Sequence, residues 1–93
     1  MNDGFQPYRV EWAGPAQRSM VRVPDKVAVV VIEFVYGAVA DKPHQVGRAL
    51  RWELEGLHSA RRGDYRIVYR IDDDRHVVVI EAIAHRADIY RRR

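Results

Sequence analysis

The clearest pattern in the chain is an alternation of apolar and polar residues over residues 64–71. Neighbouring side chains of a strand point to opposite faces, so one face should build core. That apolar face would consist of Tyr65, Ile67, Tyr69 and Ile71. The opposite face presents Arg66 and Arg70, and Arg61 and Arg62 lie across the turn at Gly63. Arginines fixed on a strand suit phosphate binding, and the plainer alternative is a solvated face whose arginines meet nearby carboxylates.

Two helices are predicted in the first half of the chain. Residues 8–12 alternate between aromatic or apolar and charged side chains, which predicts a short first strand. Residues 16–23 follow a weak helical pattern that Pro24 interrupts. Residues 27–38 are rich in valine, and we expect a helix rather than a buried strand because the run exceeds about ten residues and is followed by glycine and proline. The two helices would form a hairpin.

The second half predicts strands. Residues 41–48 contain proline and glycine and indicate a loop, and residues 49–55 fit either a short helical turn or an extended linker. Residues 57–61 are a candidate strand that turns back into the alternating segment. Residues 77–84 are apolar on both faces except for Glu81, which is typical of a central strand covered by helices on at least one side.

The predicted order β-α-α-β-β-β indicates an α+β fold, a small, mostly antiparallel sheet with an N-terminal helical hairpin packed on it. A chain of 93 residues should form a single domain, residues 1–93. The absence of cysteine excludes disulfides and thiolate metal sites and fits a reducing compartment. No segment has the length of a membrane helix and no signal peptide is visible, so we expect a cytoplasmic protein that does not bind membranes.

The positive charge is almost entirely arginine. The net charge is +3, and Lys26 and Lys42 are the only lysines among 16 basic residues. This bias favours planar recognition of phosphate or carboxylate, so the expected partners are nucleic acid, an acidic protein segment, or both. The acidic run at 72–74 lacks further ligands at suitable spacing, and neither a metal site nor a cofactor is expected.

Four motifs resemble those of a known family. They are residues 23–26 (VPDK), residues 47–50 (GRAL) leading to 54–57 (LEGL), residues 59–69 (SARRGDYRIVY) and residues 85–90 (HRADIY). Together they resemble the RelE/ParE superfamily of toxins from bacterial and archaeal toxin–antitoxin systems, and within it the RelE branch.

The resemblance implies an endoribonuclease that enters the ribosomal A site and cuts mRNA there, which stops translation until a cognate antitoxin wraps the toxin. Carried over by position, the arginines that grip phosphate are Arg61 and Arg66, and a third cation falls on Arg86. The tyrosine that stacks on a base or serves near the reacting group falls on Tyr90. The best-known RelE-type toxins carry lysines where this chain has His58 and Ser59.

Metal-free cleavage of RNA uses the 2′-hydroxyl as nucleophile and needs a group that removes its proton. Arginine rarely releases a proton near neutral pH, so His85 is the first candidate and Tyr90 the second. The alternatives are structural, with His85 capping the strand and bonding a backbone group and Tyr90 packing beneath the sheet. The expected catalytic residues are therefore Arg61, Arg66, His85, Arg86 and Tyr90. Further RNA contacts are expected from His58, Arg62, Arg70, Arg91 and Arg92.

The resemblance also implies partners. We expect a RelB-like antitoxin whose acidic, partly helical segment covers the arginine face or the helical hairpin, in a toxin–antitoxin hetero-oligomer, with the ribosome and mRNA as targets. Two alternatives remain open. One is a ParE-like toxin that binds DNA gyrase and is no nuclease, because fold does not fix function. The other is a degenerate member that only binds its antitoxin and helps to repress their shared promoter.

Overall fold

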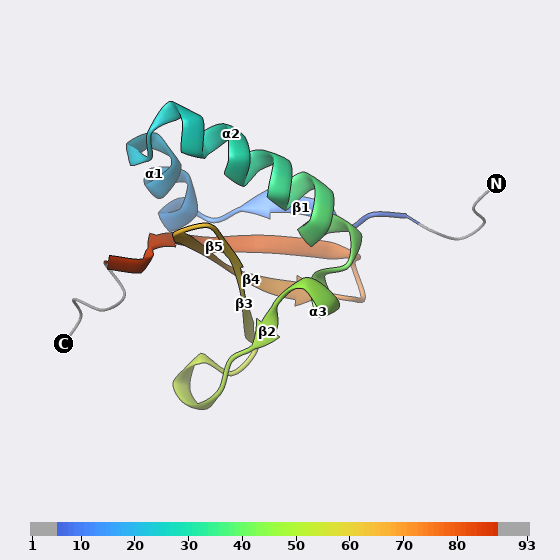
Figure 1. Cartoon of the computed structure of the whole chain (residues 1–93). Coiled ribbons are helices and arrows are strands. Elements are labelled where there is room, and N and C mark those ends of the chain that lie inside the picture. The colour runs from blue at the N-terminus through green and yellow to red at the C-terminus, as the bar shows by residue number, and fades with distance from the viewer. Residues whose placement is uncertain (1–5, 88–93) are drawn as a thin grey trace.

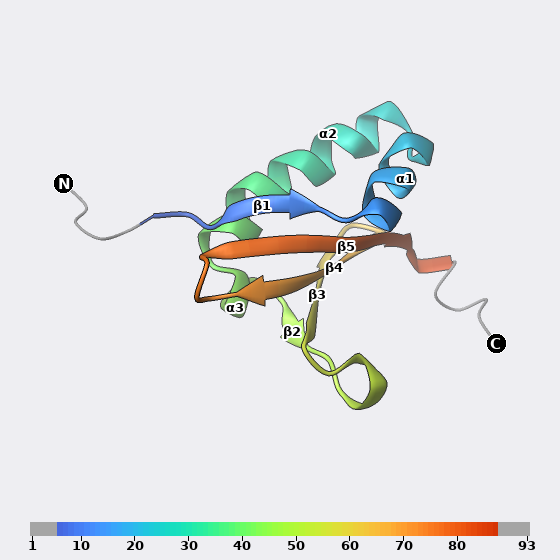
Figure 2. The same ribbon diagram turned by 180° about the vertical axis from the view of Figure 1, so that it is seen from behind.

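The computed structural model describes residues 6–87. Helices lie across one face of a five-stranded sheet (Figures 1 and 2). In chain order the elements are β1 (Arg9–Trp12), α1 (Gly14–Arg22), α2 (Asp25–Phe34), a π-helical turn (Val35–Val39), α3 (Pro43–Val46), β2 (Arg48–Ala49), a 3₁₀ turn (Trp52–Leu54), β3 (Leu57–Arg62), β4 (Tyr65–Asp72) and β5 (Val77–His85). The predicted α+β fold with its N-terminal helical hairpin is confirmed. No helix among these residues is long and apolar enough to cross a membrane.

The strand order is β1-β5-β4-β3-β2. The strands β2 to β5 pair antiparallel with their neighbours, whereas β1 runs parallel to β5, with Arg9 opposite Val77. The segment predicted as a central strand, β5, therefore lies inside the sheet between β1 and β4. The first and last strands of the described chain are direct neighbours.

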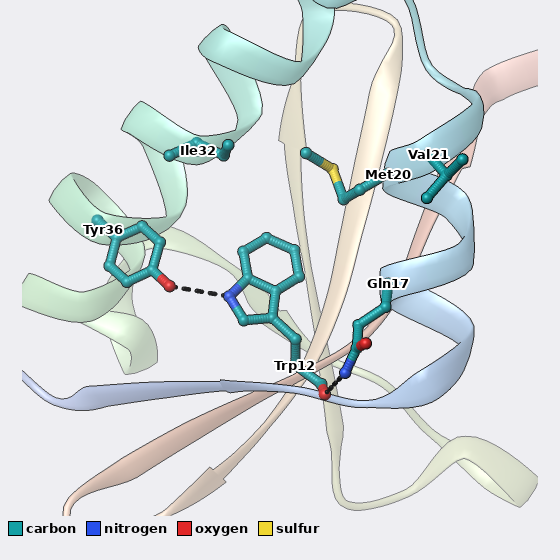
Figure 3. Close-up of a pocket in the computed structure, with 6 residues that line it drawn as sticks. All are labelled: Trp12, Gln17, Met20, Val21, Ile32 and Tyr36. Atoms are coloured by element: carbon teal, nitrogen blue, oxygen red, sulfur yellow. Dashed lines mark hydrogen bonds between the residues drawn. The ribbon is translucent and has the colours of Figure 1, made fainter.

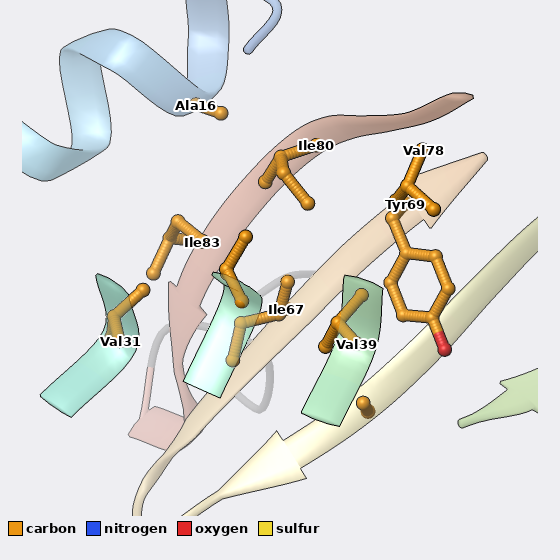
Figure 4. Packing of buried hydrophobic residues seen from close by; sticks show 10 residues of the cluster. Ala16, Val31, Val39, Ile67, Tyr69, Val78, Ile80 and Ile83 are labelled. Carbon is orange, nitrogen blue, oxygen red and sulfur yellow. The ribbon is translucent and has the colours of Figure 1, made fainter. Parts of the chain in front are cut away.

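The core lies between the helical hairpin and the sheet (Figure 4). Helix α1 begins at Gly14 and Pro15, where the missing N–H of proline costs nothing, and it ends at Arg22 before Pro24. In α2 and the π-helical turn that continues it, a spacing of four residues buries Val31, Val35 and Val39 against the sheet. From the strands, fully buried side chains are Ile67, Tyr69, Val77, Val78 and Ile80. The predicted core face of β4 is confirmed at its centre.

Residues 41–48 differ from the predicted loop. Pro43 begins the short helix α3 rather than breaking a helix, and Arg48 and Ala49 add a two-residue strand at the edge of the sheet. Gly47 separates these two elements. For residues 49–55 the sequence allowed either a short helical turn or an extended linker. The structure contains both, because the extended end of β2 is followed by the 3₁₀ turn.

A β-bulge interrupts the pairing of β4 with β5. Val68 lies opposite Ala82 and Tyr69 lies opposite Ile80, which leaves Glu81 without a partner residue in the ladder. An extra residue reverses the faces of all side chains that follow it in the strand. Ile80 and Ile83 consequently both belong to the core, although three positions separate them.

Candidate nucleic-acid interface

A polar pocket of about 460 Å³ opens at the edge of the sheet where β3 extends beyond β2. We call it the arginine pocket. It is lined by Val46, Gly47, Arg48, Ser59, Ala60, Arg61 and Arg66. Pockets of this size accommodate small-molecule groups such as a nucleotide.

Three neighbouring strands supply the arginines of this pocket. Arg61 on β3 lies directly opposite Arg66 on β4, because the turn at Gly63 fixes the register of the hairpin. Arg48 on β2 lies opposite Ser59. Ser59 is two residues from Arg61, so all three arginines emerge on the same face of the sheet, opposite the hairpin of α1 and α2.

None of these three arginines forms an ion pair with a carboxylate of residues 6–87. Within the part of the chain that the structure describes, their one side-chain hydrogen bond is long and runs from the Arg66 guanidinium to the Ser59 hydroxyl oxygen at 3.4 Å. Like charges directly opposite each other on a sheet repel. A phosphate bound between Arg61 and Arg66 would relieve this repulsion and accept hydrogen bonds from both.

The backbone of Arg61 adds a donor. The Leu50 amide donates to the Leu57 carbonyl oxygen at 2.8 Å, so the odd-numbered residues of β3 direct their backbone groups toward β2. Since β2 begins at Arg48, opposite Ser59, the amide of Arg61 points past the end of β2 into the open edge. Anion sites commonly use such a backbone amide beside cationic side chains.

The other predicted arginines lie elsewhere. Arg70 forms an ion pair with Glu81 at 3.4 Å, which is the plainer alternative considered for this strand face. Arg62 lies opposite Tyr65 and thus belongs to the helix-facing side of β3. Arg86 follows β5, its amide donates to the Asp64 carbonyl oxygen at 2.8 Å, and its side chain does not line the arginine pocket.

His85 does not share a site with Arg61 and Arg66. It lies opposite Tyr65, whose ring it meets edge-to-face at 5.0 Å, in a second pocket shared with Ser19 and Arg22 of α1. Its Nδ1 accepts a hydrogen bond from the Ala87 amide at 3.0 Å, which is the strand-capping role named as the alternative. The bulge at Glu81 explains why His85 lies on the helix-facing side of the sheet. Without the extra residue, alternation from Val77 would have put His85 on the face that carries Arg61 and Arg66.

His58 is also away from the arginine pocket. Its ring packs between those of His44 and Tyr69, with both centroid distances at 5.7 Å. Burial, followed by the nearby His44, lowers the pKa of His58 and so favours the neutral form of its ring. His44 in turn bonds the carboxylate of Asp73 at 3.0 Å. The predicted RNA contact by His58 stays a prediction that this position does not favour.

Tyr90, Arg91 and Arg92 lie outside the described residues, and their proposed roles stay predictions. Sequence reasoning missed Arg48 as a site residue, although it stands inside the GRAL motif. Within residues 6–87, no group of three or more histidine, aspartate or glutamate side chains could hold a metal ion.

A second surface feature is an apolar groove of about 400 Å³ between α1, α2 and β1. It is lined by Trp12, Gln17, Met20, Val21, Ile32 and Tyr36 (Figure 3). The Trp12 indole nitrogen donates to the Tyr36 hydroxyl at 2.9 Å, and Gln17 donates to the Trp12 carbonyl oxygen at 2.9 Å. Val21 is 85% exposed, and contiguous exposed apolar side chains of this kind mark interaction surfaces.

Comparison with known proteins identifies the family. A family model described as the ParE toxin of the type II toxin–antitoxin system parDE matches residues 10–90. The chain is a RelE/ParE superfamily toxin. Toxin RelE of Mycobacterium tuberculosis (strain ATCC 25618 / H37Rv) is 52% identical over 85 residues, which cover 91% of this chain and 88% of that protein. Toxin RelG of the same strain is 48% identical over 86 residues, which cover 92% of this chain and 99% of that protein.

Solved structures agree with this assignment. The toxin–antitoxin complex RelBE2 from Mycobacterium tuberculosis contains a chain that matches this toxin with a TM-score of 0.86 at 44% identity, covering 94% of this chain and 100% of that chain. The isolated E. coli RelE toxin matches with a TM-score of 0.70 at 14% identity, covering 89% and 90%, which shows a shared fold alone. The predicted membership of the RelE branch is confirmed.

Proposed function

We propose that this toxin is a metal-independent endoribonuclease that cuts mRNA on the ribosome and thereby inhibits translation. The observation that carries the proposal is the pair Arg61 and Arg66, directly opposite each other in one pocket and without a carboxylate partner among residues 6–87. The relatives at about half identity, named Toxin RelE and Toxin RelG, support the same branch.

In this reaction the 2′-oxygen attacks the adjacent phosphorus, an O2′–P bond forms and the bond to the 5′-oxygen breaks. The 2′-hydroxyl gives up its proton and the departing 5′-oxygen takes one up, so the products are a 2′,3′-cyclic phosphate and a free 5′-hydroxyl. Arg61 and Arg66 would stabilise the additional negative charge on the phosphorus centre, which is commonly the largest catalytic contribution. They cannot accept the proton of the 2′-hydroxyl, because a guanidinium keeps its proton at any physiological pH.

The proton acceptor must therefore come from another group. His85 lies on the helix-facing side of the sheet, so the position of His85 does not favour this role. Tyr90, the second candidate, is therefore the residue to test next, since its phenol hydroxyl can exchange a proton. Exchange to phenylalanine keeps the ring and removes only the hydroxyl.

The test is induced expression followed by primer-extension mapping of transcripts. Wild-type toxin should give cuts within translated regions, and Arg66→Ala should reduce them roughly 10²- to 10³-fold, as expected for loss of one oxyanion donor. Arg75→Ala is a matched control, because Arg75 is exposed, pairs with Glu11 and Asp72 and does not line the arginine pocket. Intact transcripts with the wild-type toxin would overturn the proposal.

Gyrase binding is a second candidate, because the matching family model is named for ParE toxins. A gyrase-binding toxin would leave transcripts uncut and would inhibit supercoiling of plasmid DNA by purified gyrase. Arg66→Ala would then have no special effect compared with Arg75→Ala. The two assays run on the same protein therefore separate the two functions.

We propose further that a RelB-like antitoxin binds this toxin and that one apolar face of an antitoxin helix occupies the apolar groove. The RelBE2 relative was solved as a toxin–antitoxin complex. The groove offers exposed apolar side chains on two helices, which is the arrangement that receives an amphipathic helix. An acidic segment of the same antitoxin would complement the arginine pocket.

Affinity measurement with the antitoxin tests this partner surface. Val21→Asp puts a charge into the groove and should weaken binding at least tenfold. Val29→Asp is the matched control, because Val29 is 55% exposed on α2 but does not line the groove. Equal affinities of the two variants would place the antitoxin elsewhere on the toxin.

A further inference from the structure

We propose that Arg48 binds the RNA phosphate next to the one that is cleaved, so that the arginine pocket holds two consecutive phosphates. This inference rests on the proposed nuclease function and extends it, because Arg48 is no part of the catalytic set derived from the sequence. It assigns Arg48 to substrate binding rather than to bond cleavage.

The spacing of the three arginines is the first argument. Arg66, Arg61 and Arg48 stand on three successive strands, and neighbouring strands are about 4.8 Å apart, which places the outer backbones roughly 10 Å from each other. Arg48 is also displaced from Arg61 along the strand direction, because its partner Ser59 is two residues away. Arg61 and Arg66 lie opposite each other and can share one phosphate, whereas Arg48 lies two residues away along the direction of β3, at the position of a second phosphate.

The size and charge of the pocket are the second argument. A single phosphate fills only a fraction of a pocket of about 460 Å³. With Arg61 and Arg66 sharing one phosphate, the remaining cation would be left without a counter-ion in the bound state. A neighbouring phosphate of the same RNA strand supplies that charge, and each phosphate neutralised also releases a condensed counter-ion, which favours binding.

The placement of Arg48 depends on Gly47. A methyl group at position 47 would overlap the Tyr69 hydroxyl oxygen and would come within 2.9 Å of the Ser59 carbonyl oxygen. Tyr69 is fully buried, and its hydroxyl donates to the Pro43 carbonyl oxygen at 2.7 Å. The missing side chain of Gly47 thus lets the chain pass close over Tyr69, which brings Arg48 beside β3 and into the pocket.

The experiment measures binding of a single-stranded RNA that is 2′-O-methylated throughout and cannot be cut. Fluorescence anisotropy at several salt concentrations gives the slope of log K against log salt, which for single strands changes by about 0.7 for each phosphate contact. Arg48→Ala should lower the magnitude of the slope by about 0.7 and raise the Kd roughly tenfold, which corresponds to loss of one charge-assisted contact. Arg48→Lys should keep the slope of the wild type.

Arg51→Ala is the matched control, because Arg51 is three residues further along the same segment, is exposed and does not line the pocket. It should keep the wild-type slope. If Arg48→Ala and Arg51→Ala give the same slope, the inference is wrong. Absence of measurable RNA binding by the wild-type toxin would overturn it as well.

A cleavage assay in a translating extract separates this inference from the proposed function. Arg48→Ala should slow cleavage at low toxin concentration and recover most of the wild-type rate at saturation, whereas Arg66→Ala should stay inactive at saturation. Loss of cleavage by Arg48→Ala at saturation would assign Arg48 to the scissile phosphate and refute the second phosphate. Failure of the wild-type toxin to cut, with a reduced slope for Arg48→Ala, would refute only the nuclease function.

Discussion

Replacement of Gly47 by alanine tests the close packing beneath the arginine pocket. The added methyl group would overlap the buried Tyr69 hydroxyl and approach a backbone oxygen of β3, so one of them must move. Overpacking of this kind costs about 1–3 kcal/mol. Displacement of the Tyr69 hydroxyl from the Pro43 carbonyl oxygen adds about 1 kcal/mol for a lost hydrogen bond.

The expected decrease in the free energy of unfolding is therefore about 2–4 kcal/mol. For a domain of this size a change of 1 kcal/mol shifts Tm by about 4–8 °C, so a loss near the middle of the range lowers Tm by roughly 12–24 °C. Urea and thermal unfolding followed by circular dichroism would measure both quantities on the purified variant.

Gly37→Ala is the matched control for this prediction. A methyl group at Gly37 would meet no atom within 4 Å, and the position is exposed in the helical segment that follows α2. Alanine is favoured over glycine in a helix by about 0.5–1 kcal/mol, so this variant should be as stable as the wild type or more stable. Equal stabilities of Gly47→Ala and Gly37→Ala would refute the packing account.

Two further predictions concern pH. Burial raises the pKa of Tyr69 to about 12, so its neutral form stabilises the fold below the ordinary value of 10.0, and this stability is lost as pH rises from there through about 12. Absorbance titration of the folded toxin should show a phenolate that titrates near pH 12 and is absent in Tyr69→Phe. The hydrogen bond from Tyr8 and that from His44 lower the pKa of Asp73, so its stabilisation is present above the ordinary value of 3.8 and is lost as pH falls below it. The difference in unfolding free energy between wild type and Asp73→Asn should accordingly shrink with acidification, and a difference independent of pH would contradict this.

Local patterns were sufficient to predict the hairpin of β3 and β4. Alternation predicted the buried face of β4. The sequence placed the tight turn at Arg62 and Gly63, whereas in the structure β3 extends to Arg62 and the turn is Gly63 and Asp64, which makes Arg61 and Arg66 opposite residues. The helical hairpin could be predicted from its length, its proline break and its apolar spacing. These features depend on residues that are close in sequence.

Features that depend on distant contacts were missed. The strand β2 has two residues and the helix α3 has four, too short for a periodic signal, so both depend on packing against β3 and the second helix. Arg48 was not predicted as a site residue because it lies on this short strand. His85 was expected beside the arginines because nothing in the sequence marks Glu81 as a bulge, and a single extra residue changes the face of everything after it.

The parallel pairing of β1 with β5 has a consequence for biosynthesis. The helical hairpin is made early, yet the strand on which α1 packs is completed only when residue 85 has been added. Until then β1 is not paired with the other described strands, and the side chains of β5 are missing from the core. The closed core can therefore form only after β5 has been synthesised, because this strand alone connects β1 to the other strands of the described sheet.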